Sequence, residues 1–438
     1  MTNDRKRSTV TRMTSAAVIG LMALGLAACG TSGSGTSPGA DPGPGAGGVE
    51  GVDDGTSLTL WTRAPMEQQA KLLVDAYNAS HENQVDLTIV PNDDYVAKVG
   101  AAAGSGGLPD LFAADIVYVP NWVEQGLFQD LTGRIDELPF KDEINAGHLE
   151  AGTYDDAAHV LPFVLDISVL FYNKDLYEQA GLDPEAPPTT LREMAEHAKA
   201  VDALGGDVDG TFFGGNCGGC LVFTWFPSVW AAGDEVMAND GTESLLASET
   251  AQEVYDIYAD LVASDAVGAG TRDETGATWV APFQEGKVGV MPYPATLLAT
   301  TDESVDVGVA PIPGPDGGAS TFVGGDGIGI SKDSESSDQA WHFLSWMMSE
   351  DAQVEVLAKN GDVTSRADLA DNEYSSQDPR VVTINEVASQ GRTPVARNFQ
   401  QAFNAPTSPW LTLIRNAVFE GGTTVPEDND EITAVLQQ

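Results

Sequence analysis

The sequence predicts an α/β protein with two domains, and three observations support this fold class. Strand-like and helix-like segments alternate from residue 57 to residue 127, which is the order of a parallel, doubly wound sheet. A long apolar run at 161–172 has the composition of a strand buried on both faces. Beyond its Gly/Ser-rich start the chain has about 380 residues, which exceeds one usual domain and suits two.

The first domain is predicted from three strand–helix units. Three short apolar runs are the strands, at 58–61, 85–90 and 108–115. Helices follow them, starting at Pro65 and near Tyr95 and covering 122–127. Because ligands of such sheets bind beyond the carboxyl ends of the strands, Arg63 and Glu67 after the first strand and Asp115 after the third are candidate ligand-binding residues.

The apolar run at 161–172 contains one carboxylate, Asp166. A strand without it would be more stable, because a buried charge needs a partner or another compensation. We therefore predict a functional role for Asp166.

Two helices are predicted after this strand. The first starts at 173–175 and ends at Gly181, a favourable residue just beyond a helix C-terminus. The second covers 191–204, where Thr190 and Glu193 have the spacing of a capping box.

The stretch from 161 to 201 carries a family resemblance. The strand, the segment YNKDLYEQAGL, a Pro-rich turn and the pattern T-x-x-E-x-x-x-x-A resemble the extracellular solute-binding proteins of ABC importers. The resemblance is closest to the carbohydrate-binding branch that includes maltose-binding protein (family 1). It implies a two-lobed, periplasmic-binding-protein-like fold, in which each lobe is a doubly wound, mainly parallel sheet flanked by helices and hinge segments join the lobes. The implied boundaries are 57–162 with 295–331 for the first lobe, and 163–294 with 332–438 for the second.

Later segments resemble the same family and add candidate residues. FQEGKVGVM at 283–291 and SSDQAWHFLSWMMSEDAQ at 336–353 follow in family order. The resemblance implies aromatic ligand platforms at Trp225, Tyr293 and Trp410. In GGDGIG, the glycines would let the backbone approach a ligand, and Asp326 would accept hydroxyl hydrogen bonds.

The first 56 residues predict export and anchoring. Residues 1–28 have a basic start and an apolar run too short to span a bilayer, as in a signal peptide. Leu26-Ala27-Ala28-Cys29 matches a lipobox, so Cys29 is the expected site of lipid (thioether and palmitate) attachment and the mature N-terminus. Residues 29–56 are predicted to be a flexible Gly/Ser/Pro tether. We expect a protein outside the cytoplasm, held at the outer face of the cell membrane only by this lipid.

Composition excludes some partners. The chain has 66 acidic and 21 basic side chains and a net charge of −45, which repels nucleic acid. The five histidines are scattered, so neither a metal site nor another cofactor is expected. Asp207-Val208-Asp209-Gly210 lacks the final glutamate of a calcium loop.

Cys217 and Cys220 form a C-x-x-C pair. Outside the cytosol such a pair most simply forms a local structural disulfide. A redox-active pair would need a helix to start after the motif, whereas 221–223 resembles an extended segment.

The combined prediction is a monomeric, non-enzymatic binding protein that clamps a carbohydrate between its lobes and delivers it to a membrane permease. One alternative is the same clamp for a non-sugar such as an amino acid or a polyamine. Another is a secreted glycoside hydrolase, since paired carboxylates and aromatic platforms serve both functions. The sequence does not identify the sugar.

Overall fold

The computed structural model describes residues 50–302 and 304–438. The predicted signal peptide, Cys29 and most of the tether lie outside the described residues. Within the described part, no helix combines the length and the apolar character needed to cross a membrane.

The last residues of the predicted tether are packed against the protein. The Val52 N–H donates to the carbonyl of Asp338 at 3.1 Å. The Asn83 side-chain oxygen accepts the backbone N–H groups of Asp54, Gly55 and Thr56 at 3.0–3.1 Å. The tether prediction is therefore wrong for residues 52–56, because one asparagine side chain fixes this backbone.

The first lobe is built on three parallel strands, as predicted. β1 (Ser57–Arg63) lies between β2 (Gln84–Val90) and β3 (Leu111–Asp115). The helices α1 (Glu67–Ser80), α2 (Asn92–Ser105) and α3 (Val119–Glu124) follow the three strands in turn. Leu58 and Leu60 of β1 have no exposed surface and pack with Leu73 and Tyr77 of α1. The apolar side chains at alternate positions of β1 thus form the surface on which α1 packs.

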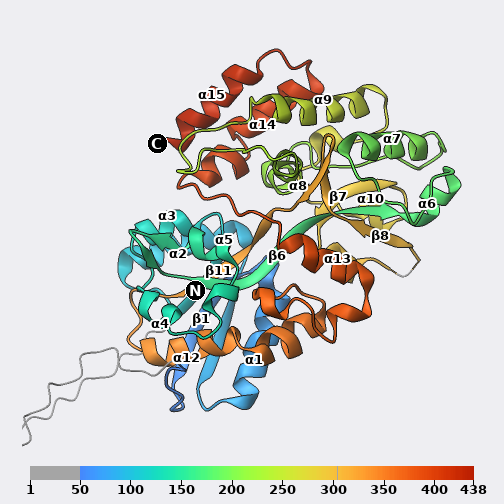
Figure 1. Ribbon diagram of the computed structural model, residues 1–438. Helices are drawn as coiled ribbons and strands as arrows, with labels where there is room; N and C mark the ends of the chain where they lie inside the picture. Colours follow the sequence, from blue (N-terminus) through green and yellow to red (C-terminus); the bar gives the residue numbers. More distant parts are fainter. Residues whose placement is uncertain (1–49, 303) are drawn as a thin grey trace, which may run out of the picture. The chain divides into compact units, whose positions relative to one another are not determined.

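A single strand, β6 (Leu161–Asn173), pairs with elements of both lobes (Figure 1). Its first half pairs antiparallel with β11 (Val323–Ile330), which also pairs antiparallel with β3. Its second half pairs antiparallel with β7 (Val290–Pro294) and β8 (Val307–Ala310). The sheet order is β2-β1-β3-β11-β6-β7, with β8 on β6.

The second lobe is mainly helical around an aromatic core. Its helices include α7 (Leu191–Asp202), α8 (Gly218–Ala231), α9 (Glu249–Ala263), α14 (Pro409–Ile414) and α15 (Val425–Leu436). The Thr190 side chain accepts the Glu193 N–H at 2.9 Å, which confirms the predicted start of α7. The remaining elements are α4 (Thr132–Asp136), α5 (Ala146–Ala151), β4 (Thr153–Tyr154), β5 (Ala157–Ala158), α6 (Lys174–Gln179), α10 (Ala281–Gln284), α11 (Leu297–Thr300), β9 (Ile312–Gly314), β10 (Gly317–Ser320), α12 (Ser337–Met347) and α13 (Pro379–Ala388).

The packing differs from the lobe boundaries that the resemblance implied. Trp341 and Leu344 of α12, expected in the second lobe, share one buried cluster with Leu58 and Leu60 of β1. Conversely, Leu297 and Val307, expected in the first lobe, are buried in another cluster with Phe171 and Met291. Helix α12 therefore returns to the first lobe, and only β11 from the 295–331 stretch belongs there.

Three chain segments meet where the lobes join. The Ser168 N–H and carbonyl both bond the Thr321 hydroxyl, at 2.9 and 2.7 Å. The Val323 N–H donates to the carbonyl of Arg392 at 2.9 Å. These bonds connect the middle of β6 with the segments around 321–323 and 392.

The predicted Cys217–Cys220 disulfide is present. The expectation that 221–223 is extended is wrong, because α8 starts at Gly218 with Cys217 as its N-cap. The apolar residues that suggested a strand are buried on several sides of this helix: Leu221, Trp225 and Trp230 are at most 5% exposed.

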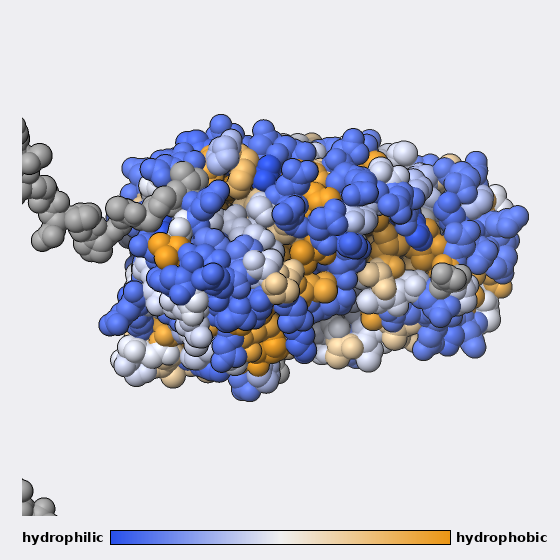
Figure 2. Space-filling model, turned by 90° about the horizontal axis from the view of Figure 1, so that it is seen from below, coloured by the Kyte–Doolittle hydropathy of each residue, from blue (hydrophilic) through white to orange (hydrophobic). Residues whose placement is uncertain are grey.

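One face of the molecule is shown in Figure 2. Hydrophilic residues cover most of it, and hydrophobic residues form separate patches between them. A mostly hydrophilic face agrees with the excess of acidic side chains in the sequence.

Candidate functional site

The site begins at the carboxyl end of β1, where Arg63 binds two carboxylates. Its Nε donates to Asp326 Oδ1 at 2.8 Å and its Nη2 donates to the same oxygen at 2.5 Å. Its Nη1 lies 3.2 Å from Asp115 Oδ2. Asp115 and Asp326 are directly paired in the β3–β11 ladder, so the sheet register places both carboxylates beside Arg63.

Asp115 and Asp326 differ in burial, and they therefore have different roles at Arg63. Burial alone would lower the pKa of Arg63, but the attraction of Asp115 and Asp326 outweighs it and raises that pKa. Asp326 has no exposed surface and its oxygens accept bonds from Arg63. The prediction that Asp326 itself accepts ligand hydroxyls therefore does not agree with the structure, because Arg63 occupies both of its oxygens. Asp326 orients Arg63, whereas the Asp115 side chain remains 27% exposed.

Asp166 lies half-buried in the middle of β6, on the same face as its cross-strand partner Gly324. Burial raises the pKa of its carboxyl from 3.8 to about 7; Arg63 opposes this shift, while the negative charges of Asp362, Asp115 and Asp326 add to it. One carboxylate oxygen of Asp166 is buried without a hydrogen-bond partner among the described residues. Asp166 therefore shares the electrostatic environment of Arg63 and Asp115, and one of its oxygens has unused acceptor capacity.

Tyr293 stands at the end of β7 and extends the site into the second lobe. Burial raises the pKa of its hydroxyl to about 12, and the negative charges of Asp166 and Glu274 contribute. Its ring lies 4.3 Å, centroid to centroid, from the ring of Trp279. The second lobe thus presents a pair of packed aromatic rings, of which Tyr293 has its hydroxyl within electrostatic reach of Asp166.

Sequence reasoning missed several members of this cluster. Gln69 Nε2 donates to Asp362 Oδ1 at 2.9 Å, and Asn360 donates to the other oxygen at 2.8 Å. Burial also raises the pKa of Asp362. Gln69 lies only two residues beyond Glu67 after the end of β1, so the strand-end rule could have found it. Asp362 lies in an irregular loop, and no pattern in the sequence marks it.

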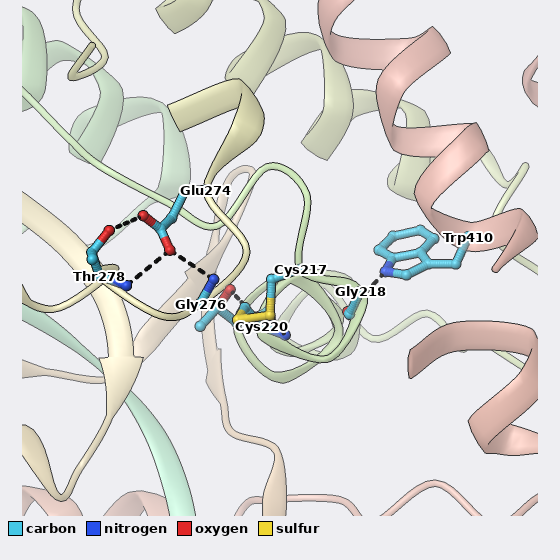
Figure 3. The surroundings of a disulfide bond; sticks show 8 residues. Cys217, Gly218, Cys220, Glu274, Gly276, Thr278 and Trp410 are labelled. Atoms are coloured by element: carbon cyan, nitrogen blue, oxygen red, sulfur yellow. Dashed lines mark hydrogen bonds between the residues drawn. A yellow bond between two sulfur atoms is a disulfide. The ribbon is translucent and has the colours of Figure 1, made fainter. Parts of the chain in front are cut away.

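Three predicted site residues are not part of this cluster. Trp225 is 1% exposed and stacks on Tyr258 at 3.9 Å. Trp410 has no exposed surface, and its Nε1 donates to the carbonyl of Gly218 at 3.3 Å (Figure 3). Both predicted platforms are therefore core residues of the second lobe. Glu67 forms an exposed i,i+4 ion pair with Lys71 on α1.

The glycines of GGDGIG serve protein packing. A Cβ on Gly324 would lie 2.9 Å from the Phe223 ring, and one on Gly325 would lie 2.0 Å from the carbonyl oxygen of Val164. Gly325 also has φ +98°, which favours glycine. We predicted that these glycines let a ligand approach the backbone. In the structure, the backbone of β6 and the Phe223 ring occupy that space instead.

A cavity of about 770 Å³ lies elsewhere, and we call it the Arg392 cavity. Leu165 and Val323 line it, whereas their neighbours Asp166 and Gly324 do not. Since successive strand residues point to opposite faces, this cavity opens on the other side of β6 and β11 from Asp166. Arg392 itself is paired with Glu235. We take the polar cluster as the candidate site, because it combines an unpartnered carboxylate oxygen with side chains from β1, β3, β6 and β7.

A metal site finds no support in the described part of the chain. No group of three or more His, Cys, Asp or Glu residues there could hold an ion. In the cluster, the carboxylates of Asp115 and Asp326 contact the guanidinium of Arg63, and that of Asp362 accepts from two side-chain amides.

Comparison with known proteins places the chain in a family context. The family model for bacterial extracellular solute-binding proteins matches residues 63–354, about two thirds of the chain. A binding protein of Brucella abortus is 25% identical over 294 residues, covering 66% of this chain and 70% of that protein. The sn-glycerol-3-phosphate-binding periplasmic protein of Pectobacterium atrosepticum is 28% identical over 173 residues, covering 35% and 37%.

Solved structures show the same two-lobed fold. The cyclic α-maltosyl-1,6-maltose-binding protein of Arthrobacter globiformis superposes with a TM-score of 0.74 at 26% identity, covering 88% of this chain and all of that one. A solute-binding protein of Thermotoga lettingae, bound with α-D-tagatose, gives a TM-score of 0.75 at 19% identity, covering 87% and all of that chain.

Proposed function

The chain belongs to the family of bacterial extracellular solute-binding proteins, and from this membership we propose that it captures a sugar or oligosaccharide for an ABC importer. The observation that carries the proposal is the convergence of Arg63, Asp115, Asp166 and Tyr293 from strands of both lobes. Relatives with the same fold bind sugars, by their descriptions.

The cluster can bind a polyol by complementary polar and apolar contacts. The carboxylates of Asp115 and of half-buried Asp166 would accept hydroxyl hydrogen bonds, each worth about 1.5–3 kcal/mol when charge-assisted. The ring of Tyr293 would pack against the C–H face of a sugar, supported from behind by Trp279. Since neither lobe alone supplies all these groups, a bound sugar favours the closed arrangement by its differential affinity.

Delivery and anchoring complete the proposal. The closed form would dock on a membrane permease and release its sugar unchanged. A lipid on Cys29 would hold the protein, as a monomer, at the outer face of the membrane. Replacement of Cys29 tests the anchor directly, as described below.

A second candidate ligand is an amine-bearing solute, such as a polyamine. Within the described cluster, Asp115 and Asp326 bind the guanidinium of Arg63, Asp166 is in its electrostatic environment and Asp362 adds a fourth carboxyl group, so the acidic groups outnumber the basic one. The same excess argues against a phosphate ester such as glycerol 3-phosphate, because Arg63 is already bound by two carboxylates.

The test is a thermal-shift panel of D-glucose, maltose, maltotriose, D-glucosamine and spermidine. A ligand at 100 times its dissociation constant raises the unfolding free energy by about 2.7 kcal/mol. Recovery of intact sugar after incubation indicates a binder, and cleavage products indicate a glycoside hydrolase. A panel without any shift would contradict the proposal for these ligands.

Two matched variants locate the ligand. Asp115→Asn removes an acceptor from the polar cluster, and Arg392→Met alters the lining of the Arg392 cavity. We expect the first variant alone to lose affinity. If only Arg392→Met loses affinity, the ligand binds in the cavity and the assignment of the polar cluster is wrong.

A further inference from the structure

Helix α8 begins at the disulfide. Cys217 is its N-cap, and Cys217 Sγ accepts the backbone N–H of Cys220 at 3.2 Å. Both cysteines are half-buried, so the bond lies near the protein surface. The Cys217–Cys220 bond thus closes a small ring on the first turn of the helix.

The backbone of Gly276 lies against this disulfide (Figure 3). A Cβ at Gly276 would lie 3.0 Å from Cys220 Sγ and 3.1 Å from Cys217 Sγ. Gly276 also has φ +95°, a conformation that favours glycine. The sulfur atoms therefore have no free space on the side of Gly276.

Hydrogen bonds fix the loop that carries Gly276. The Asn216 N–H, next to Cys217, donates to the carbonyl of Glu274 at 2.9 Å. The Glu274 carboxylate accepts the backbone N–H groups of Gly276 and Thr278 at 2.7 and 3.1 Å, and the Thr278 hydroxyl donates to it as well. The position of residues 274–278 thus depends on the segment around the disulfide.

This loop leads directly into the aromatic wall of the candidate site. Trp279 follows Thr278, is 5% exposed and packs its ring on Tyr293. Tyr293 in turn lies within electrostatic reach of Asp166 and Glu274. A continuous series of contacts therefore connects the sulfur atoms with the ring that we assign to the sugar.

We propose that the Cys217–Cys220 disulfide positions the Trp279–Tyr293 pair through the 274–278 loop, and that ligand affinity therefore depends on its redox state. The inference rests on the proposed function. A dithiol reductant would supply two electrons and two protons: the Cys217–Cys220 bond breaks, each cysteine becomes a thiol, and the reductant forms its own disulfide. The unbonded sulfur atoms then separate, and the Gly276 backbone is displaced because it contacts both.

The test compares the oxidised full chain with the chain reduced by dithiothreitol. The dissociation constants for D-glucose, maltose and D-glucosamine are measured together with hydrogen exchange of the peptide covering 271–280. We expect reduction to weaken binding by up to about 2- to 12-fold, the range of one lost aromatic contact. Exchange of the peptide should become faster, and the near-UV circular dichroism of Trp279, assigned with Trp279→Phe, should decrease.

Three variants distinguish a change in the position of the 274–278 loop from a general loss of protein stability. Cys217→Ser/Cys220→Ser should bind as weakly as the reduced chain and should not respond to dithiothreitol. Gly276→Ala should weaken binding while the disulfide stays intact. Gly233→Ala is its matched control: Gly233 has φ +86° but open space around its Cβ position, so this variant should lose stability and keep its affinity.

The outcomes distinguish the two proposals. If reduction changes neither the dissociation constants nor the exchange of 271–280, the positioning role is wrong although sugar binding stands. If no sugar binds the oxidised chain, the proposed function fails for these ligands, and the exchange and dichroism measurements still decide whether the disulfide positions the loop.

Discussion

Replacement of Arg63 by methionine tests the charge arrangement at the site. Arg63→Met keeps much of the side-chain volume but removes the donors to Asp326 Oδ1 at 2.8 and 2.5 Å and to Oδ2 at 3.1 Å. Asp326 has no exposed surface, so water cannot replace these donors. Breaking a buried pair by removing one partner costs about 3–5 kcal/mol. We expect a loss of that size in the free energy of unfolding.

A double-mutant cycle separates the ion pair from packing. Asp326→Asn removes the charge that Arg63→Met leaves unpaired, so the double variant should recover about 0.5–3 kcal/mol of the loss. Asp115, which is partly exposed, can be solvated and should contribute little to the cycle. Lys71→Met is the control, because the Lys71–Glu67 pair is exposed and worth at most about 1 kcal/mol.

The assay is urea unfolding at pH 7, followed by circular dichroism and by tryptophan fluorescence. Coincident transitions are required, because two-lobed proteins can unfold in more than one step. If Arg63→Met costs no more than Lys71→Met, Asp326 does not depend on Arg63 and the assigned role of this pair is refuted.

Three further predictions concern the site and the anchor. The raised pKa of Asp166 means that the folded chain binds this proton more tightly than the unfolded chain between pH 3.8 and about 7, so stability falls as pH rises through that window. Asp166→Asn should therefore raise the melting temperature at pH 8, show no gain at pH 4 and weaken sugar binding; equal gains at both pH values would contradict the assignment. Tyr293→Ala should weaken binding about 2- to 12-fold, whereas the core variant Trp225→Phe should lower the melting temperature without changing affinity, as titration calorimetry and thermal unfolding will show. Cys29→Ser should move the protein from the membrane fraction to the medium, and palmitate labelling should disappear; retention of label would place the lipid elsewhere.

The candidate site contains more of the polar residues predicted from the sequence than of the predicted aromatic residues. Asp166 was identifiable because a carboxylate in an apolar strand is unusual, and Arg63 and Asp115 because parallel strands end at a common edge. Trp225 and Trp410 were misassigned since a tryptophan in a core and one in a binding site have similar local sequences. Their burial depends on Tyr258 and Gly218, which are distant in sequence.

Long-range packing also explains the other errors. Residues 221–223 suggested a strand because a helix buried on all sides lacks the amphipathic period. Helix α12 follows β11 directly, and only its contacts with β1 show that it belongs to the first lobe. Asp362 is recognisable as a site residue only through its bonds with Gln69 and Asn360.

The position of β6 restricts how the chain can tolerate insertions. Leu165 faces the Arg392 cavity, and Asp166 faces the polar cluster. Adding or deleting a single residue between 161 and 165 would exchange these two side chains, putting a carboxylate at the Arg392 cavity and a leucine among carboxylates. An insertion or deletion of two residues keeps each side chain on its own face of the sheet. Insertions and deletions in this strand should therefore comprise an even number of residues.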